Sequence, residues 1–351
     1  MCERESQPVA VSSHEGPRTM AEVETIRGRS PDRREFLIAA GLASLPLLTG
    51  FRSPAALLGA PPASSHLATR STTMGMITVG KENSTPIEIY YEDHGRGRPV
   101  VLSHGWPLSG AAWEKQLPAL LSAGYRVITY DRRGFGKSSQ PTVGYDYGTF
   151  ADDLHKLMTT LDLHDVTLVG HSMGSGEVAG YIGKYGTSQV RRAVFVSALP
   201  FFVKSADNPN GVDPSVPEGV AKALVADRPA FLSSFLADFY NTDVQLGKRV
   251  SPQVVQGSWN TAYGASAFGT VACVSAWGTN FRADVARVDV PALIIHGDAD
   301  RILPYATTAV PLSKAIKGAQ LVTVKDGPHG IPWTHGAEVN DALLHFLSMH
   351  S

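Results

Sequence analysis

The stretch Val166-Thr167-Leu168-Val169-Gly170-His171-Ser172-Met173-Gly174 decides the fold, because an apolar run leads straight into Gly-x-Ser-x-Gly and a helix-like stretch follows. The run predicts a buried strand, and the pentapeptide falls at the turn into the helix. Such a sharp turn forces its central residue into strained backbone dihedrals, and only small flanking residues fit beside it. The pattern therefore predicts that Ser172 projects its hydroxyl above the end of the strand as a nucleophile. Gly-Ser-Gly clusters also form ordinary turns, so the rest of the chain must distinguish the two interpretations.

From about residue 74, predicted strands alternate with predicted helices, which is the pattern of an α/β fold with a mostly parallel sheet. Residues 77–79 and 87–91 alternate in character and predict an antiparallel hairpin at one edge. Continuous apolar runs predict strands buried on both faces at 99–102, 126–130, 166–169, 193–196, 292–295 and 321–324. Helical periodicity fills the gaps at 111–122, 150–161, 177–185, 306–315 and 337–348.

The interval between Leu199 and Pro291 breaks this alternation, since it contains no clear strand and is rich in Ala, Phe and Trp. Loop signals open it at 209–217, and helical segments follow near 218–227 and 230–240. We therefore expect an inserted helical cap at about residues 200–288. The expected domain division is a signal peptide and linker over residues 1–73 and one α/β domain over residues 74–351.

Composition limits the classes of function. The 351 residues include 31 Lys and Arg against 32 Asp and Glu, so no excess of positive charge favours nucleic acid or an anionic membrane surface as a partner. Cysteine occurs only as Cys2 and Cys273, which provides no disulfide framework. We expect Cys273 to be a small buried apolar side chain.

The leader carries a targeting pattern. Asp32-Arg33-Arg34-Glu35-Phe36-Leu37 opens an uncharged, moderately apolar run that ends at Phe51, and it looks like a twin-arginine signal peptide. The run is too short to span a bilayer, so a membrane anchor is the weaker interpretation. We expect export to the periplasm or the medium; the alternative is a leader that stays in the cytoplasm with the enzyme.

A serine nucleophile needs an imidazole to take its proton and a carboxylate to hold that imidazole. Both follow Ser172 in the chain: His296-Gly297-Asp298-Ala299-Asp300 ends one predicted strand, and Gly327-Pro328-His329-Gly330 follows the last one. The order Ser, Asp, His is the one expected of α/β hydrolases, with each residue at the carboxyl end of a strand. Asp298 and Asp300 both remain candidates for the carboxylate on this argument.

Developing negative charge on an attacked carbonyl requires hydrogen-bond donors. The backbone N–H of Met173, the first residue after the nucleophile, is one candidate. A second donor is expected from the loop after the first parallel strand, where Trp106 precedes Pro107. Arg132 or Arg133, in the turn after the next strand, is expected to form an ion pair nearby.

The chain from about residue 74 resembles the cofactor-free haloperoxidases and aryl esterases of the α/β-hydrolase fold. The matching stretches are residues 103–107, 131–138, 170–179, 296–300 and 328–330. The resemblance implies that Asp300 is the catalytic acid and that the second oxyanion donor is the amide of Trp106. Asp298 is then expected to be structural and to hold its own turn by backbone hydrogen bonds.

The resemblance implies a serine hydrolase that acts on small acyl esters through Ser172, Asp300 and His329, with water or hydrogen peroxide as acceptor. It implies no metal and no cofactor. Attack by peroxide would yield a peracid, so perhydrolase activity of the non-haem chloroperoxidase type is expected beside ester hydrolysis. The alternatives are lactonase or amidase activity on the same residues, and a ligand-binding receptor built on the fold.

A phosphate-binding loop and a metal site are both disfavoured by the sequence. Gly136-Lys137-Ser138 matches the end of a phosphate-loop motif, but Asp131 stands where that motif requires its first glycine. His104, His164 and His171 form no cluster with metal-ligand spacing, so we expect structural roles for them.

Overall fold

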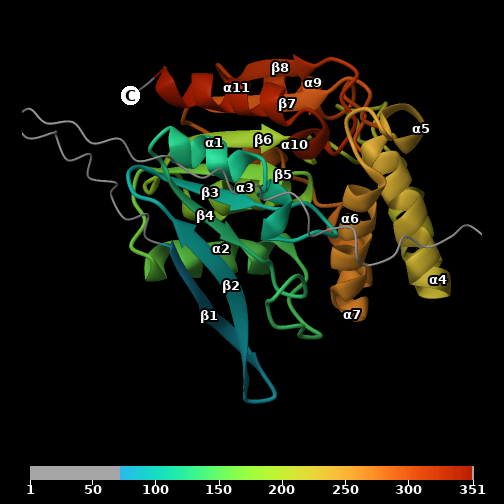
Figure 1. The fold of residues 1–351 in the computed structure, drawn as a ribbon, viewed down its shortest axis with the longest axis horizontal. Helices are drawn as coiled ribbons and strands as arrows, with labels where there is room; N and C mark the ends of the chain where they lie inside the picture. Colours follow the sequence, from blue (N-terminus) through green and yellow to red (C-terminus); the bar gives the residue numbers. More distant parts are fainter. Residues whose placement is uncertain (1–71, 350–351) are drawn as a thin grey trace, which may run out of the picture. The chain divides into compact units, whose positions relative to one another are not determined.

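The computed structural model describes residues 72–349, which form one eight-stranded sheet in the order β1-β2-β4-β3-β5-β6-β7-β8 (Figure 1). The strands β1 and β2 pair antiparallel, as do β2 and β4, and every other neighbouring pair is parallel. Their bounds are β1 Thr72–Glu82, β2 Thr85–His94, β3 Pro99–Ser103, β4 Arg126–Tyr130, β5 Val166–His171, β6 Val190–Val196, β7 Ala292–Gly297 and β8 Gln320–Val324. The predicted edge hairpin and mostly parallel sheet are confirmed.

Helices cover both faces of the sheet. In β5, Leu168 joins one apolar cluster with the helices α2 and α3, while the next residue, Val169, joins another with α1 and α11. Because successive side chains of a strand point to opposite faces, an uninterrupted apolar run is what two covered faces require. The bounds are η1 Gly110–Trp113, α1 Gln116–Ser122, α2 Tyr147–Thr160, α3 Met173–Tyr185, α9 Ala309–Ala315, α10 Ile331–Thr334 and α11 Gly336–Ser348.

The interval between β6 and β7 contains helices and no strand among its described residues. These helices are α4 Ser215–Tyr240, α5 Thr242–Gln245, α6 Pro252–Gly264, α7 Ala267–Ala276 and α8 Arg282–Val285. Helices α4, α6 and α7 stand together beyond the carboxyl ends of the strands (Figure 1). α4 is kinked at Asp227, whose φ of −157° and ψ of 85° are not helical, and Pro229 follows. The two helical segments expected on either side of this point are therefore both present.

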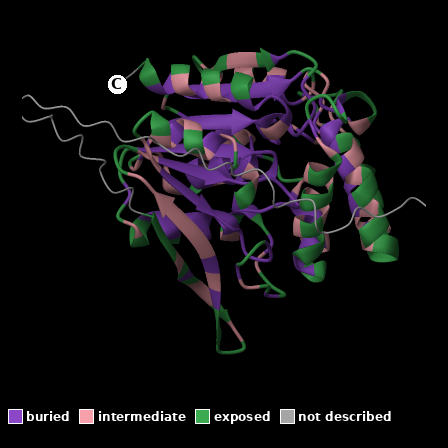
Figure 2. Ribbon diagram, in the orientation of Figure 1, coloured by how far each residue is buried: buried purple, intermediate pink, exposed green. Residues whose placement is uncertain are grey.

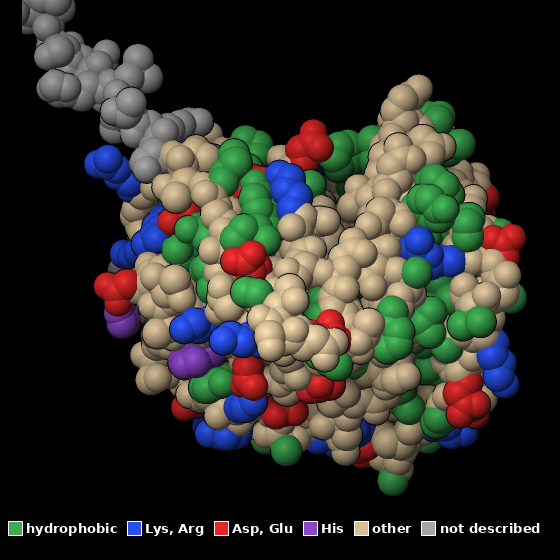
Figure 3. Space-filling view, turned by 90° about the horizontal axis from the view of Figure 1, so that it is seen from below, with side chains coloured by type: hydrophobic (Ala, Val, Ile, Leu, Met, Phe, Trp, Pro, Cys, Tyr) green, Lys and Arg blue, Asp and Glu red, His purple; other side chains and the backbone are tan. Residues whose placement is uncertain are grey.

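Burial follows this layering. All six residues of β5 are buried, and the central strands are buried along their length (Figure 2). On the face seen in Figure 3, basic and acidic side chains are interspersed rather than gathered by sign, as the balanced composition suggests. Within residues 72–349, no helix is both long enough and apolar enough to cross a membrane.

The stretch that resembles part of a phosphate loop is a turn held by Asp131. The Asp131 carboxylate accepts hydrogen bonds from the amides of Gly110 and Lys137, each at 2.7 Å. Gly136 has a φ of 53°, and a Cβ at this position would collide with the Asp131 carboxylate. This turn joins the end of β4 to η1, near the loop that carries Trp106.

Residues 1–71 lie outside the described part of the chain. The expected signal peptide, with Arg33 and Arg34, and Cys2 fall there. The domain limits at residue 73 and at about residues 200 and 288 stay predictions.

Candidate active site

Ser172 occupies the turn between β5 and α3. Its φ of 55° and ψ of −120° place it in a sparsely populated backbone region, which costs free energy and persists only where the surroundings impose it. A Cβ on Gly170 would collide with the backbone of Gly174, and one on Gly174 would collide with the backbone of Ser103. The two glycines of the pattern are therefore required by close backbone approach on both sides of Ser172.

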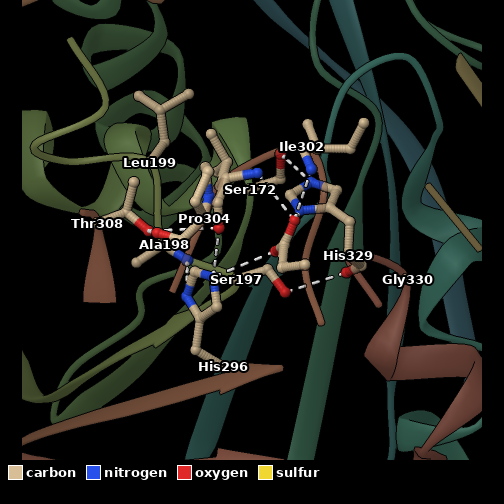
Figure 4. A network of polar contacts seen from close by, with 12 residues as sticks. Ser172, Ser197, Ala198, Leu199, His296, Ile302, Pro304, Thr308, His329 and Gly330 are labelled. Atoms are coloured by element: carbon tan, nitrogen blue, oxygen red, sulfur yellow. Dashed lines mark hydrogen bonds and ion pairs between the residues drawn. The ribbon is translucent and has the colours of Figure 1, made fainter. Parts of the chain in front are cut away.

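His329 lies between Ser172 and Asp300, and Figure 4 shows it beside Ser172. Its Nε2 is 2.8 Å from Ser172 Oγ, and its Nδ1 is 2.8 Å from Asp300 Oδ2. A carboxylate can only accept, so Nδ1 carries the proton and Nε2 is free to accept from the serine hydroxyl. The structure thus brings together the three side chains from the ends of β5, β7 and β8.

The Asp300 carboxylate is held on both oxygens. Oδ1 accepts from the amides of Ile302 and Leu303 at 2.9 and 2.8 Å, and Nε2 of His296 lies 3.2 Å from Oδ2. Burial alone would raise the pKa of Asp300, but the nearby His329 and the hydrogen bond from His296 lower it below its usual range. Asp300 is therefore ionised and fixed in orientation.

The main chain of His329 is also anchored. Its carbonyl oxygen accepts from Ser197 Oγ and from His171 Nε2, both at 3.0 Å. Burial lowers the pKa of His171 to about 3, and His329 adds to the shift, so His171 is neutral near pH 7. Two uncharged donors therefore hold the main chain of His329 in place.

Trp106 and Met173 carry the two expected oxyanion donors. Met173 begins α3, and Trp106 follows β3 in the loop that leads to η1. Neither amide donates a hydrogen bond to a group within residues 72–349. The Trp106 side chain is fixed, because its indole Nε1 donates to Thr270 O at 3.2 Å and its ring meets Phe235 edge to face.

A buried ion pair joins the two segments that carry these amides. Arg132 and Glu177 approach to 2.6 Å with side chains 1% and 0% exposed. Arg132 Nη2 also donates to the carbonyl of His104 at 2.9 Å, and its amide donates to His104 Nε2 at 3.0 Å. The pair therefore links α3 to the loop that runs from His104 to Trp106. Arg133 pairs with Asp153 at 2.6 Å, so both arginines form ion pairs, where the sequence predicted a pair for one or the other.

Asp298 makes no hydrogen bond to Ser172 or His329 within residues 72–349. Its Oδ1 accepts from the amide of Asp326 at 2.6 Å, so it ties the loop after β7 to the loop after β8 instead of holding its own turn.

Cys273 is fully buried, and burial raises the pKa of its thiol to about 12. Among residues 72–349, no group of three or more His, Cys, Asp or Glu side chains is arranged to hold a metal ion.

The sequence did not indicate the contacts of His296, Ser197 and His171 with the site. His296 stands four residues before Asp300, in the same stretch of sequence. This proximity is the one signal that could have pointed to His296. Ser197 directly follows β6 and belongs to no sequence motif that would have pointed to it.

Comparison with known proteins places the chain in a family. A profile described as alpha/beta hydrolase fold matches residues 98–336. A Synechocystis protein provisionally named a non-heme chloroperoxidase is 60% identical over 275 residues, 78% of this chain and 100% of that protein. The bifunctional esterase/perhydrolase of Acinetobacter calcoaceticus is 33% identical over 265 residues, 74% of this chain and 96% of that protein. The crystal structure of a bromoperoxidase from Bacillus anthracis matches at 48% identity with a TM-score of 0.75, over 78% of this chain and 99% of that one. The chain therefore belongs to the α/β-hydrolase fold family and, within it, to the enzymes named non-heme chloroperoxidases and haloperoxidases.

Proposed function

We propose that this enzyme is a serine hydrolase that cleaves small acyl esters through an acyl-enzyme on Ser172. One observation carries the proposal: Ser172, His329 and Asp300 are joined by two hydrogen bonds of 2.8 Å, each with the correct donor and acceptor. A serine hydroxyl is a weak nucleophile until a base takes its proton, and the buried carboxylate stabilises the imidazolium that results.

In the acylation step, Ser172 Oγ attacks the ester carbonyl while its proton passes to His329 Nε2. The amides of Trp106 and Met173 are the proposed donors to the oxyanion, since neither has another acceptor among the described residues. Collapse of the tetrahedral intermediate breaks the bond to the alcohol oxygen, and His329 returns the proton to that oxygen. The alcohol leaves and the acyl group stays on Ser172.

In the second step, His329 takes a proton from water, and the water oxygen attacks the acyl carbon. The bond from that carbon to Ser172 Oγ then breaks, and His329 returns the proton to Oγ. The products are a carboxylic acid and free Ser172. If hydrogen peroxide takes the place of water, its O–O bond stays intact and the product is a peracid, which then oxidises halide in solution. The names of the relatives, esterase/perhydrolase and chloroperoxidase, support this second reaction.

The test is labelling and turnover with Ser172→Ala. A fluorophosphonate probe should modify the wild type once and leave the variant unlabelled. Ester hydrolysis should fall by about a thousandfold or more, because the nucleophile is gone. Circular dichroism checks that the variant is folded, and peracid formation with hydrogen peroxide should fall in parallel.

Retention of more than a tenth of the wild-type rate by folded Ser172→Ala would contradict the mechanism. Failure of the probe to label the wild type would favour the receptor alternative. Faster turnover of lactones or amides than of esters would show that the enzyme is a lactonase or an amidase that uses the same three residues.

We also propose export of the enzyme through the twin-arginine route. The support is the Arg33-Arg34 pair before a short apolar run, in the part of the chain outside the described residues. Replacing both arginines by lysine should retain active precursor in the cytoplasm. Normal amounts of exported enzyme from the lysine variant would contradict this route.

A further inference from the structure

The peptide between Gly105 and Trp106 has its carbonyl oxygen held by two donors. His104 Nδ1 lies 2.9 Å from Gly105 O, and the Leu108 amide donates to the same oxygen at 3.0 Å. A carbonyl oxygen can only accept, so His104 Nδ1 carries a proton and donates it. The two bonds use both lone pairs of the oxygen and oppose rotation of this peptide.

The same peptide carries the Trp106 amide, one of the two proposed oxyanion donors. A trans peptide is planar and holds its C=O and N–H on opposite sides, and the bond between Gly105 and Trp106 is trans. A donor that fixes Gly105 O therefore also fixes the direction of the Trp106 N–H. The His104 ring lies on the carbonyl side, so the N–H points away from that ring.

This peptide also lies against Ser172. A Cβ on Gly105 would approach Ser172 Cβ to 3.1 Å and His171 Nδ1 to 2.8 Å, so the close contact requires glycine. Glycine gives the backbone more conformational freedom than any other residue. The bonds to Gly105 O therefore restrain a peptide whose own residue does little to restrain it.

His104 is itself fixed in one tautomer. The Arg132 amide donates to His104 Nε2 at 3.0 Å, so Nε2 carries no proton and Nδ1 must carry it. Arg132 Nη2 donates to the His104 carbonyl at 2.9 Å, and the imidazole meets the Phe135 ring edge to face with centroids 5.8 Å apart. Burial and the nearby Arg132 charge lower the pKa of His104 well below its usual range, so the ring stays neutral.

We propose that His104 is a positioning residue for ester hydrolysis: its Nδ1–H holds Gly105 O and thereby directs the Trp106 N–H toward the oxyanion that forms beside Ser172. This inference rests on the proposed function. It gives His104 an effect on the rate of the reaction, where the sequence predicted a structural role only. His104 contacts no reacting atom and acts through the peptide that it holds.

Two substitutions separate the two nitrogens of His104. Asn places a side-chain N–H near the position of Nδ1 and has no group at the position of Nε2. Gln reaches the position of Nε2 with an acceptor and has no donor at the position of Nδ1. His104→Asn therefore keeps a donor for Gly105 O, and His104→Gln keeps an acceptor for the Arg132 amide.

We expect His104→Gln to lower kcat for para-nitrophenyl acetate by about tenfold or more. Loss of one oxyanion donor costs about 100- to 1000-fold in kcat, and a misdirected donor costs part of that. KM should change by less than about threefold, because the interaction is made only in the transition state. His104→Asn should keep kcat within about threefold of the wild type.

The matched control is Asp153→Asn. It disrupts another buried ion pair, that with Arg133, and Asp153 makes no hydrogen bond to the peptide between Gly105 and Trp106 among the described residues. This variant should lose stability in urea and keep kcat. Rates are expressed per site labelled by fluorophosphonate, and circular dichroism checks that each variant is folded.

A trifluoromethyl ketone provides a readout that needs no turnover. Ser172 Oγ bonds to the ketone carbon, its proton passes to His329, and the ketone oxygen becomes an oxyanion that the Trp106 N–H can bind. In His104→Gln, the inhibition constant of phenyl trifluoromethyl ketone should rise by a factor similar to the fall in kcat/KM. It should change little in His104→Asn and in Asp153→Asn.

Equal losses of kcat in the Asn and Gln variants would overturn the positioning role, and so would an unchanged inhibition constant in His104→Gln. If one of the two variants does not fold, the inhibition constant of the other decides: it must rise in His104→Gln and stay near the wild-type value in His104→Asn. A wild type that resists fluorophosphonate and hydrolyses no ester would instead show that the proposed function fails, and this inference would fail with it.

Discussion

At the scale of single residues, the two aspartates after β7 lie close in sequence and have different partners. Asp300 accepts from His329, and Asp298 accepts from the amide of Asp326. We expect Asp300→Asn to lower kcat for ester hydrolysis by about three to four orders of magnitude, since the amide no longer stabilises the imidazolium. Asp298→Asn should retain most activity and lose less than about 1 kcal/mol of unfolding free energy, because the amide oxygen still accepts from Asp326 and only the charge assistance to that hydrogen bond is lost.

Steady-state hydrolysis and urea unfolding of both variants measure the two effects. The opposite pattern, an inactive Asp298→Asn and an active Asp300→Asn, would assign the carboxylate role to Asp298. Sequence alone left this choice open on chemical grounds, because both residues follow the same strand. The fixing of the His329 carbonyl by Ser197 and His171 could not be predicted either, because it depends on the direction of a main-chain oxygen and no residue pattern records that direction.

At the scale of elements, the ion pair between Arg132 and Glu177 couples β4, α3 and the loop after β3. Removing one partner of a buried pair leaves an uncompensated charge, so Glu177→Gln should lower the free energy of unfolding by about 3–5 kcal/mol. Glu338→Gln is the control, because its pair with Arg249 is 43% and 44% exposed and should be worth less than about 1 kcal/mol. Urea titrations of the two variants measure the loss of unfolding free energy. A similar loss in both would show that the buried pair stabilises the fold no more than the exposed pair does.

The helices α6 and α7 show why part of the cap escaped prediction. α6 buries only Ala262 and so lacks an apolar stripe of the expected period. α7 is apolar around most of its circumference, from Ala267 to Ala276, and such a run has no helical periodicity either. The strands were easier to predict, because burial on both faces demands continuous apolar runs. The two halves of α4 were also predicted, because Asp227 and Pro229 are recognisable helix breaks.

At the scale of the whole molecule, burial of neutral histidines links stability to pH. His104 is completely buried, and burial with the nearby Arg132 charge lowers its pKa well below the usual range; burial lowers the pKa of His171 to about 3. In the unfolded chain both imidazoles take up a proton as the pH falls through about 6.5, whereas in the folded chain they do not. The unfolded state therefore gains protons that the native state excludes. Asp300 acts at lower pH, because its lowered pKa contributes stability that is lost only as the pH falls below the ordinary range of a carboxyl group.

We expect the free energy of unfolding to fall between pH 6.5 and pH 4.5 by about 1.4 kcal/mol per pH unit for each such histidine. Urea titrations across this range measure the slope. His104→Gln, which removes one of the two imidazoles but keeps a donor and an acceptor, should reduce the slope by about 1.4 kcal/mol per pH unit. His164→Ala should leave it unchanged, because that side chain is 67% exposed. A wild-type stability that is flat over this range would mean that the buried imidazoles take up protons in the folded state, which the saturated hydrogen bonds of His104 argue against.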